Sequence, residues 1–403
     1  MRIIDGIPVF GTSVDEGALK QIKKTAEDPS VAAVALMADH HRGYAVPIGG
    51  VVAYRDHISP SGVGYDIACG NKAVRTDMNG TELRQNIHGI MNDVWKNIAF
   101  GVGRKNDEKV DHQLFESDSW KISPLNGLKD LARNQLGTVG SGNHYVDLFT
   151  DEQDRVWVGC HFGSRGLGHK TATFFLEQAD AVDGMDAAPA VISTNGYLGA
   201  AYIEAMRLCG EYAYAGRDWV CTKVVYDILG ARILDSVHNH HNFAWKETHG
   251  GESLWVVRKG ATPAFPGQRG FVGGSMGEQS VILEGQYHAF GGMKDLDMLA
   301  KQHAALFSTI HGAGRVMGRM EAKGKFKNGV WVREPKVTQE MMQGWLKRAN
   351  VELRGAGVDE SPDCYKRLPE VLAEQGDTIR VLHTLTPVGV AMAGKDEFDP
   401  YKD

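Results

Sequence analysis

Acidic, thiol and imidazole side chains able to hold a divalent metal ion recur in five glycine-rich clusters along the chain. The first cluster, GYDIACGN (64–71), places Asp66 and Cys69 three positions apart in a glycine-bounded turn. A carboxylate and a thiolate can bind the same cation, because each offers an anionic donor and the glycines leave the approach open. Taken alone, the cluster is also typical of a turn with a helix-capping Asp66 and a buried Cys69.

The next two clusters each place a histidine beside glycine and small hydroxyl residues at the end of an expected strand. His144 lies in LGTVGSGNHYVD (136–147), and His161 lies in GCHFGSRGLGH (159–169). A single histidine in such a turn is usually structural, but two of them, together with the carboxylate and the thiolate, favour a metal site. The guanidinium of Arg165 and the surrounding glycine amides would suit a phosphate group.

The fourth cluster, HNHHNFAWKE (238–247), contains three histidines within four residues. Their spacing does not decide which imidazole points toward a site, and the cluster alone is also compatible with a solvated turn. It precedes RKGATPAFPG (258–267) and GGSMGEQS (273–280), a basic pair and small-residue loops that could hold phosphates. These loops lack the G-x-x-x-x-G-K-[ST] pattern, so they do not form a P-loop.

The fifth cluster, STIHGAGRVMGR (308–319), places His311 directly before Gly-Ala-Gly-Arg. An imidazole beside backbone amides and Arg315 could act on a phosphoryl group as a nucleophile or as a general acid/base. Alone, the pattern also fits a turn histidine that caps the following helix.

Together the clusters offer one thiolate, one carboxylate and several imidazoles, surrounded by serine, arginine and glycine. This donor set suits one or two borderline-soft divalent ions, Mn²⁺ or Zn²⁺, that act on a phosphate ester. A structural zinc site would pair its ligands as C-x-x-C or H-x-x-x-H, and neither pairing occurs in the sequence. Ligands dispersed over several loops predict a catalytic site.

Strands and helices that could carry these clusters are mixed along the whole chain. Short apolar runs bounded by glycine or charge predict strands at 31–38, 155–162, 253–260 and 280–285. Apolar spacing predicts helices at 17–28, 197–208 and 297–307, and a C-terminal helix at 338–349 before a strand at 378–392. We therefore expect an α/β fold with mixed sheets, whose metal and nucleotide site is built from loops at strand ends. One large domain would span 1–403, with a polar tail at about 394–403.

Composition excludes several classes of protein. The 403 residues are 42% hydrophobic and 23% charged, a globular balance that excludes disordered and fibrous chains. A net charge of -6 gives no global basic field, so a nucleic acid would have to be bound by a local patch. The five cysteines lack disulfide spacing and are expected to be thiols. No apolar run reaches the roughly 18 residues of a membrane helix, so we expect a cytoplasmic enzyme without a membrane partner.

The order of the clusters resembles that of a known family. DIACG, GSGNHY, HFGSRGLG, HHNFAWKE, RKGA, GGSMG and HGAGR follow one another, and DESPDCYK comes after them near the C-terminus. In this order they resemble the RtcB family of RNA ligases over essentially the whole chain. The resemblance implies an enzyme that joins RNA ends with a 2′,3′-cyclic phosphate or 3′-phosphate to 5′-hydroxyl ends, in tRNA splicing or RNA repair. It would use GTP and two Mn²⁺ ions through a covalent histidine–GMP intermediate.

The resemblance also implies roles for individual residues. His311 would be guanylylated, and Cys69 would bridge the two ions. Among the three clustered histidines, His241 is preferred because it directly precedes Asn242 and lies six residues before Glu247. The implied metal ligands are Asp66, Cys69, His144, His161 and His241. The implied nucleotide-binding residues are Asn143, Asp147, Ser275, Ser280, Gly312, Ala313, Gly314, Tyr365 and Lys395. The implied phosphate- or RNA-binding residues are Arg165, Lys259 and Arg315. Zn²⁺ could substitute for Mn²⁺ or inhibit, an archease-like activator is a possible partner, and the family favours a monomer.

Three positions depart from the family pattern. Asp147 stands where the family has a guanine-reading Glu, and Met392 or Ala393 replaces the lysine of a terminal Lys-Gly. The nearest lysine is Lys395 in the tail, and Ala38 replaces a proline. Buried donors and acceptors left unpaired are costly, so these changes predict weaker GTP binding or a broader nucleotide preference.

Three other interpretations of the sequence are considered. A metal-dependent RNA phosphoesterase or cyclic phosphodiesterase would use the same ions to activate water, with His311 as acid/base. A catalytically silent RNA-binding member would not need all five ligand positions and the histidine together. A domain whose clusters are coincidental turns would require seven motifs to arise in order by chance.

Overall fold

Two large β-sheets organise the protein in the computed structural model, which describes residues 1–182, 184–287, 289–290, 293–327 and 329–394. The first sheet has six strands in the order β1 (Arg2–Ile4), β2 (Ile7–Val9), β3 (Val31–His41), β4 (Ile48–Tyr54), β12 (Glu252–Lys259) and β11 (Asn242–His249). Neighbouring strands are antiparallel except for β2 and β3, which are parallel.

The second sheet has eight strands. Its main path is β10 (Ile233–His240), β6 (Gly70–Asn79), β8 (Arg155–Phe162), β7 (Tyr145–Thr150), β22 (Ile379–Gly394), β15 (Ser280–Gly285) and β14 (Arg269–Val272). β21 (Glu352–Ala356) pairs in parallel with β22 off this path. The C-terminal strand predicted at 378–392 is therefore β22, which lies inside the sheet between β7 and β15.

Four pairs of short strands complete the β-structure of the described residues. These are β5 (His57–Ile58) with β9 (Ile192–Ser193), β13 (Ala261–Pro263) with β18 (Ser308–Ile310), β16 (Ala289–Phe290) with β17 (Met293–Lys294), and β19 (Lys325–Lys327) with β20 (Val330–Arg333).

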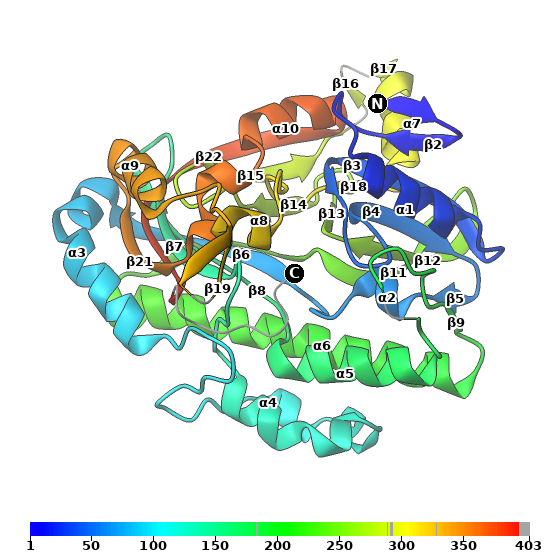
Figure 1. Ribbon diagram of the computed structural model, residues 1–403, viewed down its shortest axis with the longest axis horizontal. Helices are drawn as coiled ribbons and strands as arrows, with labels where there is room; N and C mark the ends of the chain where they lie inside the picture. The colour runs from blue at the N-terminus through cyan, green and yellow to red at the C-terminus, as the bar shows by residue number, and fades with distance from the viewer. Residues whose placement is uncertain (183, 288, 291–292, 328, 395–403) are drawn as a thin grey trace.

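Helices cover the outer faces of both sheets (Figure 1). α1 (Glu16–Ala26) packs on β3, α3 (Gly80–Asn97) packs on β22, and α6 (Tyr197–Thr222) packs on β6 and β8 with α5 (Arg165–Gln178) alongside. The other α-helices are α2 (Pro60–Val63), α4 (Lys129–Gln135), α7 (Leu296–Ala304), α8 (Arg319–Lys323), α9 (Gln339–Ala349) and α10 (Leu368–Gln375). No helix in the described part of the chain is long and apolar enough to cross a membrane.

The fold confirms the predicted α/β class with mixed sheets. The strands predicted at 155–162 and 280–285 have these bounds, and both are continuous apolar runs because the sheet is covered on both faces. The five cysteines are free, buried thiols. A single domain over the whole chain stays a prediction, and the proposed tail lies almost entirely outside the described residues.

Helix α6 is much longer than the stretch 197–208 predicted from apolar spacing. It runs to Thr222 and continues as a π-helix over Lys223–Ile228. Two glycines, Gly210 and Gly216, weaken the helical signal in the sequence because glycine disfavours helix interiors. A Cβ atom at these positions would lie 3.0 Å from the ring of Phe243 and 3.2 Å from that of Phe162. The glycines therefore let the helix approach the strand ends closely.

Candidate metal and phosphoryl-transfer site

The glycine-rich clusters meet at a cavity of about 1020 Å³. Each cluster lies at the end of a strand: Cys69 precedes β6, His144 precedes β7, His161 is next to the last residue of β8, and His311 follows β18. The predicted residues that line the cavity are Asp66, Cys69, Asn143, His144, Asp147, His161, His241, Lys259, Ser275, His311, Gly312, Ala313, Gly314, Arg315 and Tyr365. The convergence expected from the sequence is therefore present.

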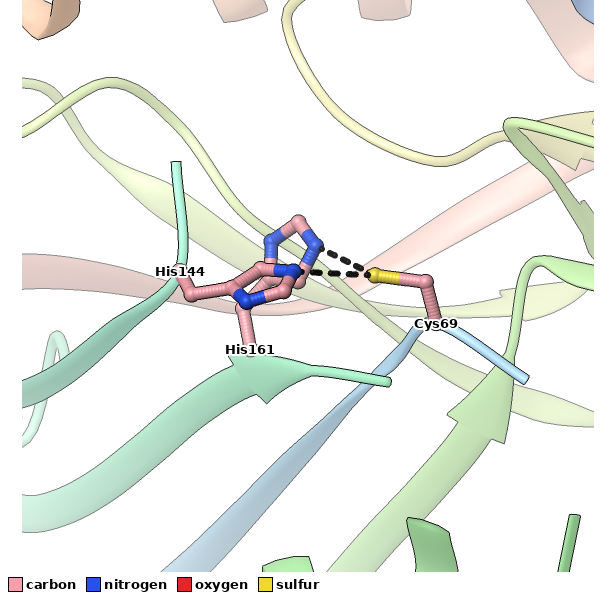
Figure 2. Close-up of side chains that lie close together, drawn as sticks. All are labelled: Cys69, His144 and His161. Carbon is pink, nitrogen blue, oxygen red and sulfur yellow. Dashed lines mark hydrogen bonds between the residues drawn. The ribbon is translucent and has the colours of Figure 1, made fainter. Parts of the chain in front are cut away.

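Strand pairing brings three donor side chains together. β8 lies between β6 and β7, and His161 pairs with Asn71 on one side and with Tyr145 on the other. The Cys69 Sγ atom consequently lies 3.1 Å from Nε2 of His161 and 3.6 Å from Nε2 of His144 (Figure 2). All three side chains are buried, so their donor atoms face one another rather than bulk water.

The hydrogen bonding of His144 leaves its Nε2 atom ready for a cation. Nδ1 lies 3.0 Å from the Val139 carbonyl oxygen, which can only accept, so Nδ1 carries the hydrogen. In the neutral ring, Nε2 then presents a lone pair, and it lies 3.0 Å from Oδ2 of Asp66. Two lone pairs facing each other beside the Cys69 thiol fit a bound metal ion, whose positive charge would satisfy both.

Burial and charge shift the ionisation of these groups. Burial would raise the pKa of Asp66, but when no metal ion is bound and the His144 ring is protonated, the hydrogen bond and charge of that ring outweigh burial and lower the pKa to about 2. Burial and the Asp66 carboxylate raise the pKa of the Cys69 thiol well above its ordinary value. A divalent cation reverses this preference, because a coordinating thiol loses its proton. The donor set therefore suits a borderline-soft ion such as Mn²⁺ or Zn²⁺.

Among the three clustered histidines, only His241 lines the cavity. It occupies the single position between β10 and β11, where the chain passes from the eight-stranded to the six-stranded sheet. Its ring centroid lies 5.0 Å from that of His161 and 5.0 Å from that of His311. Its buried Nδ1 atom has no hydrogen-bond partner among the described residues, as expected of a nitrogen available to a metal ion.

His238 and His240 instead contact Arg217, a fully buried residue that the sequence did not single out. Arg217 donates from Nε to Nε2 of His238 at 2.8 Å, and its Nη2 lies 2.9 Å from Nδ1 of His240. It also donates to the carbonyl oxygens of Ala68 and Phe162, the neighbours of Cys69 and His161. Arg217 therefore positions the two strand ends that carry these donors. Arg217 lies beyond the helix predicted at 197–208, so no predicted element carried it.

His311 is held by Asp39, a second residue whose role the sequence did not indicate. Oδ2 of Asp39 accepts from the His311 backbone N–H at 2.9 Å and from the Gly312 N–H at 3.3 Å. The same oxygen lies 2.6 Å from Nδ1 of His311. Burial alone would raise the pKa of Asp39, but the charge and hydrogen bonds of His311 outweigh it, so the pKa is lowered. The pair leaves Nε2 of His311 as the free ring nitrogen.

His41 lines the cavity beside this pair. Its Nδ1 donates to the Asp39 carbonyl oxygen at 3.1 Å, which leaves its Nε2 unprotonated. Burial lowers the pKa of His41 to about 4, so the ring is neutral near pH 7.

The predicted basic residues differ in their surroundings. Lys259 lines the cavity and donates to the backbone oxygens of Tyr44 at 2.5 Å and Ser61 at 3.3 Å. Arg315 lines the cavity and donates to the hydroxyl of Tyr365 at 2.9 Å, with Glu360 beside both. Arg165 is not among the lining residues; its Nε lies 3.4 Å from the Thr138 hydroxyl. The glutamate paired with Arg315 was not expected from the sequence.

Only some of the predicted nucleotide-binding residues line the cavity. Asp147 lies on β7, and burial raises the pKa of its carboxyl well above the ordinary value. The neighbouring strand β22 contributes Met392 to the cavity wall. Ser280 is not a lining residue; its hydroxyl accepts from the Gly274 N–H at 2.9 Å and shapes that loop. Lys395 lies outside the described residues.

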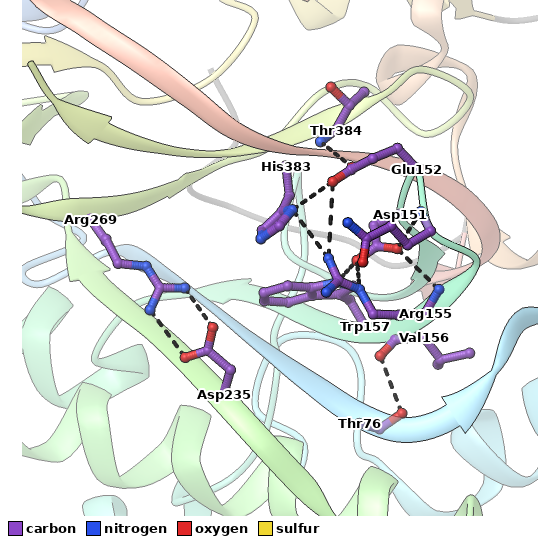
Figure 3. A network of polar contacts seen from close by, with 11 residues as sticks. Thr76, Asp151, Glu152, Arg155, Val156, Trp157, Asp235, Arg269, His383 and Thr384 are labelled. Atoms are coloured by element: carbon purple, nitrogen blue, oxygen red, sulfur yellow. Dashed lines mark hydrogen bonds and ion pairs between the residues drawn. The ribbon is translucent and has the colours of Figure 1, made fainter.

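A second group of side chains that could hold a metal ion, Asp151, Glu152 and His383, lies near the start of β22 (Figure 3). Protein donors already satisfy its acidic members. Asp151 accepts from the backbone N–H groups of Gln153 and Arg155, from Nε of Arg155 and from Nε1 of Trp157, all within 3.0 Å. Glu152 pairs with His383 at 2.7 Å. These contacts tie strand ends together, so the cluster is structural.

The cavity is typical of enzymes that transfer phosphoryl groups with bound metal ions, since dispersed thiolate, carboxylate and imidazole donors lie beside an oriented histidine. A family model described as tRNA-splicing ligase RtcB matches residues 21–124 and 125–393. The chain therefore belongs to the RtcB family, and by family it is an RNA ligase.

Curated relatives agree with this family. The chain is 29% identical over 422 residues to the RNA-splicing ligase RtcB of Escherichia coli, with 94% of each chain covered. It is 29% identical over 463 residues to the tRNA-splicing ligase RtcB of Archaeoglobus fulgidus, covering 94% of this chain and 91% of that protein. It is 27% identical over 436 residues to RNA-splicing ligase RtcB homolog 1 of Entamoeba dispar, covering 88% of this chain and 77% of that protein.

Proposed function

We propose that this enzyme joins RNA ends bearing a 2′,3′-cyclic phosphate or 3′-phosphate to 5′-hydroxyl ends, with GTP and Mn²⁺, through a covalent GMP adduct on His311. The observation that carries the proposal is the placement of His311 beside the metal-binding donors, with its Nδ1 held by Asp39 and its Nε2 free. A carboxylate orients a general acid/base histidine in the same way, so the covalent adduct is the observation that separates the two roles.

Asp66, Cys69, His144, His161 and His241 would hold the metal ions, since all five line the cavity and the donor atoms of Cys69, His144 and His161 lie within 4.8 Å of one another. Bound divalent ions would neutralise the triphosphate and orient it for in-line attack. Cys69 lies between His144 and His161, a position compatible with a sulfur shared by two ions.

His311 would supply the nucleophile for the first step. Nε2 forms a bond to the α-phosphorus of GTP as the bond to the pyrophosphate oxygen breaks, and pyrophosphate leaves. The Asp39 carboxylate keeps the hydrogen on Nδ1 and stabilises the positive charge that the ring acquires. A 2′,3′-cyclic phosphate would first be opened by water, which breaks the bond to O2′ and leaves a 3′-phosphate. The GMP then passes to an oxygen of the RNA 3′-phosphate, which frees His311. The 5′-hydroxyl attacks the activated phosphate and expels GMP.

The wall near Asp147 supports a broader nucleotide preference than that of a guanine-reading site. The Asp147 carboxyl is short, and Oδ1 is buried with no hydrogen-bond partner among the described residues. Met392 adds an apolar surface rather than an ammonium group. A carboxyl with a raised pKa can donate a hydrogen bond as well as accept one, so it can pair with more than one base edge.

The deciding experiment is intact-mass analysis after incubation with Mn²⁺ and either GTP or ATP. We expect a GMP adduct on the wild type and none on His311→Ala. His303→Ala, which changes an exposed histidine on α7 away from the cavity, is the matched control and should keep the adduct. An AMP adduct would show that base choice has changed. A wild type without either adduct that hydrolyses 2′,3′-cyclic phosphates would identify a phosphoesterase instead.

Several finer expectations remain predictions within this proposal. They are a role in tRNA splicing or RNA repair, an archease-like activator, inhibition or substitution by Zn²⁺, a monomeric state and a cytoplasmic location.

A further inference from the structure

The hairpin formed by β19 and β20 presents aromatic side chains to solvent. Phe326 is 59% exposed and Trp331 is 50% exposed, and their ring centroids lie 5.0 Å apart at an angle of 67°. Val330 and Val332 extend the exposed apolar surface. In the described part of the chain the two strands pair only with each other. Apolar side chains gathered on an exposed ribbon contribute little to a core and are typical of an interaction site.

Basic side chains accompany the aromatic pair. Lys325, Lys327 and Arg333 are all exposed, and none of them forms a salt bridge with a described carboxylate. Glu334 is the exposed acid that follows β20. A chain of net charge -6 thus carries a local positive patch on this hairpin. Such a patch can attract phosphates that the protein as a whole would not.

The hairpin is close in sequence and space to the rim of the cavity. Met317, Arg319 and Met320 line the cavity, and α8, which begins at Arg319, leads directly into β19. Phe326 lies six positions after Met320, so their Cα atoms are at most roughly 20 Å apart. Figure 1 shows α8 and β19 next to each other. A salt bridge of 3.1 Å between Lys323 and Asp359 anchors the end of α8.

We propose that the β19–β20 hairpin binds single-stranded RNA next to the end that occupies the cavity. The proposal rests on the RNA ligase function proposed above. Bases of an unpaired strand would stack on Phe326 and Trp331, and the phosphates would be attracted by Lys325, Lys327 and Arg333. Aromatic stacking combined with a basic groove or ribbon is how proteins bind single strands without sequence preference.

The strand register is compatible with both contacts at once. Phe326 is opposite Trp331, and Lys325 is opposite Arg333, so cross-strand partners share a face. Neighbouring residues on β19 alternate between faces, so Phe326 lies on one face and Lys325 and Lys327 lie on the other; a register shift between Lys325 and Phe326 accommodates the extra residue on β20. The Debye length is about 8 Å at physiological salt, so the basic groups still attract phosphates near the aromatic face. A base-paired RNA would not expose its bases for such stacking.

The test measures the affinity of a fluorescent single-stranded RNA of about 12 nucleotides with a 3′-phosphate, by anisotropy over a range of salt concentrations. For Phe326→Ala combined with Trp331→Ala we expect at least about fivefold weaker binding, since each stacked base contributes that much or more. For Lys325→Gln combined with Lys327→Gln we expect the slope of log K against log salt to fall by about 1.4, from about 0.7 per lost phosphate contact.

Matched controls separate this role from a general surface effect. Tyr197→Ala removes an 86% exposed aromatic ring at the start of α6 and should leave RNA affinity unchanged. The four hairpin side chains are exposed, so melting temperatures should match the wild type. Formation of the His311 adduct needs no RNA and should proceed normally in both hairpin variants.

Three outcomes would overturn the inference. The first is wild-type RNA affinity and salt dependence in both hairpin variants. The second is an equal loss in Tyr197→Ala. The third is a wild type that self-associates through the hairpin and a Phe326→Ala/Trp331→Ala variant that does not, which would identify a second copy as the occupant. Absence of an adduct on wild-type His311, with RNA binding still lost in the hairpin variants, would refute the proposed reaction and leave this inference standing.

Discussion

Replacing Asp39 by asparagine should slow nucleotide transfer to His311 while keeping the ring in place. Oδ2 of Asp39 accepts from the backbone N–H groups of His311 and Gly312 and faces Nδ1 of the His311 ring. The asparagine oxygen can occupy the same position, so the orientation and tautomer of the ring are preserved. The negative charge is lost, and the imidazole needs that charge most when it becomes cationic on bonding to phosphorus.

The size of the effect follows from these contacts. A hydrogen bond to a charged group contributes about 1.5–3 kcal/mol, and one between neutral groups contributes about 0.5–1.5 kcal/mol. The difference at the 2.6 Å contact between Asp39 and His311 is therefore about 1–2 kcal/mol. If this difference is expressed in the transition state, the rate falls about 5- to 30-fold. The amide nitrogen of asparagine would replace Oδ1, which is buried and has no hydrogen-bond partner among the described residues. We therefore also expect some loss of stability.

The assay follows adduct formation by mass spectrometry under single-turnover conditions with GTP and Mn²⁺. Asp39→Ala should be slower than Asp39→Asn, because it removes the orientation of the His311 ring as well as the charge. Asp5→Asn, which changes an exposed carboxylate paired with Lys23, is the matched control. A wild-type rate in Asp39→Asn would refute the role of charge. Inactivity equal to that of His311→Ala would show that the asparagine misorients the ring.

The other predictions concern ligands, stability and close packing. Cys69→Ala should abolish ligation and weaken Mn²⁺ binding, as measured by calorimetric titration. The loss should exceed the roughly 10- to 100-fold that is typical when a hydrogen-bond partner of a metal ligand is mutated. Burial would raise the pKa of Asp151, but the N–H groups that donate to its carboxylate outweigh burial and lower the pKa. The stability that this carboxylate adds to the folded protein is therefore fully present above about pH 4 and is lost as the pH falls further. Urea unfolding should accordingly show Asp151→Asn to be less stable than the wild type at pH 7, with the difference shrinking below about pH 4. Gly140→Ala should destabilise the protein and impair ligation, because its φ is +92° and a Cβ would lie 2.1 Å from the Arg165 guanidinium. Gly103→Ala, at φ +70° in open space, isolates the backbone contribution.

The sequence supported the fold class well because its local signals were strong. Apolar runs over 155–162 and 280–285 predicted strands with the observed bounds, since a strand covered on both faces reads as continuous apolar residues. Helix α6 was predicted too short because Gly210 and Gly216 are unfavourable by propensity. Their place in the helix depends on the rings of Phe243 and Phe162, which are distant in sequence.

The chemistry of the site was also predictable in kind. Carboxylate, thiolate and imidazole donors in glycine-rich turns indicate a metal ion wherever they meet. The spacing of the three clustered histidines could not show which one faces the cavity. Arg217, reaching from α6 to His238 and His240, leaves His241 as the ring in the cavity. The partnership of Asp39 with His311, 272 positions apart, was likewise outside any local pattern.

The sequence by itself therefore determined the types of donor, the order of the clusters and the secondary structure that carries most of them. Only the tertiary structure decided which donors share a cavity. Cys69 and His161 are 92 positions apart, and their 3.1 Å contact exists because β6 and β8 are neighbours in one sheet. Propensity and donor chemistry are properties of short segments, whereas the meeting of strand ends depends on the pairing and packing of the whole chain.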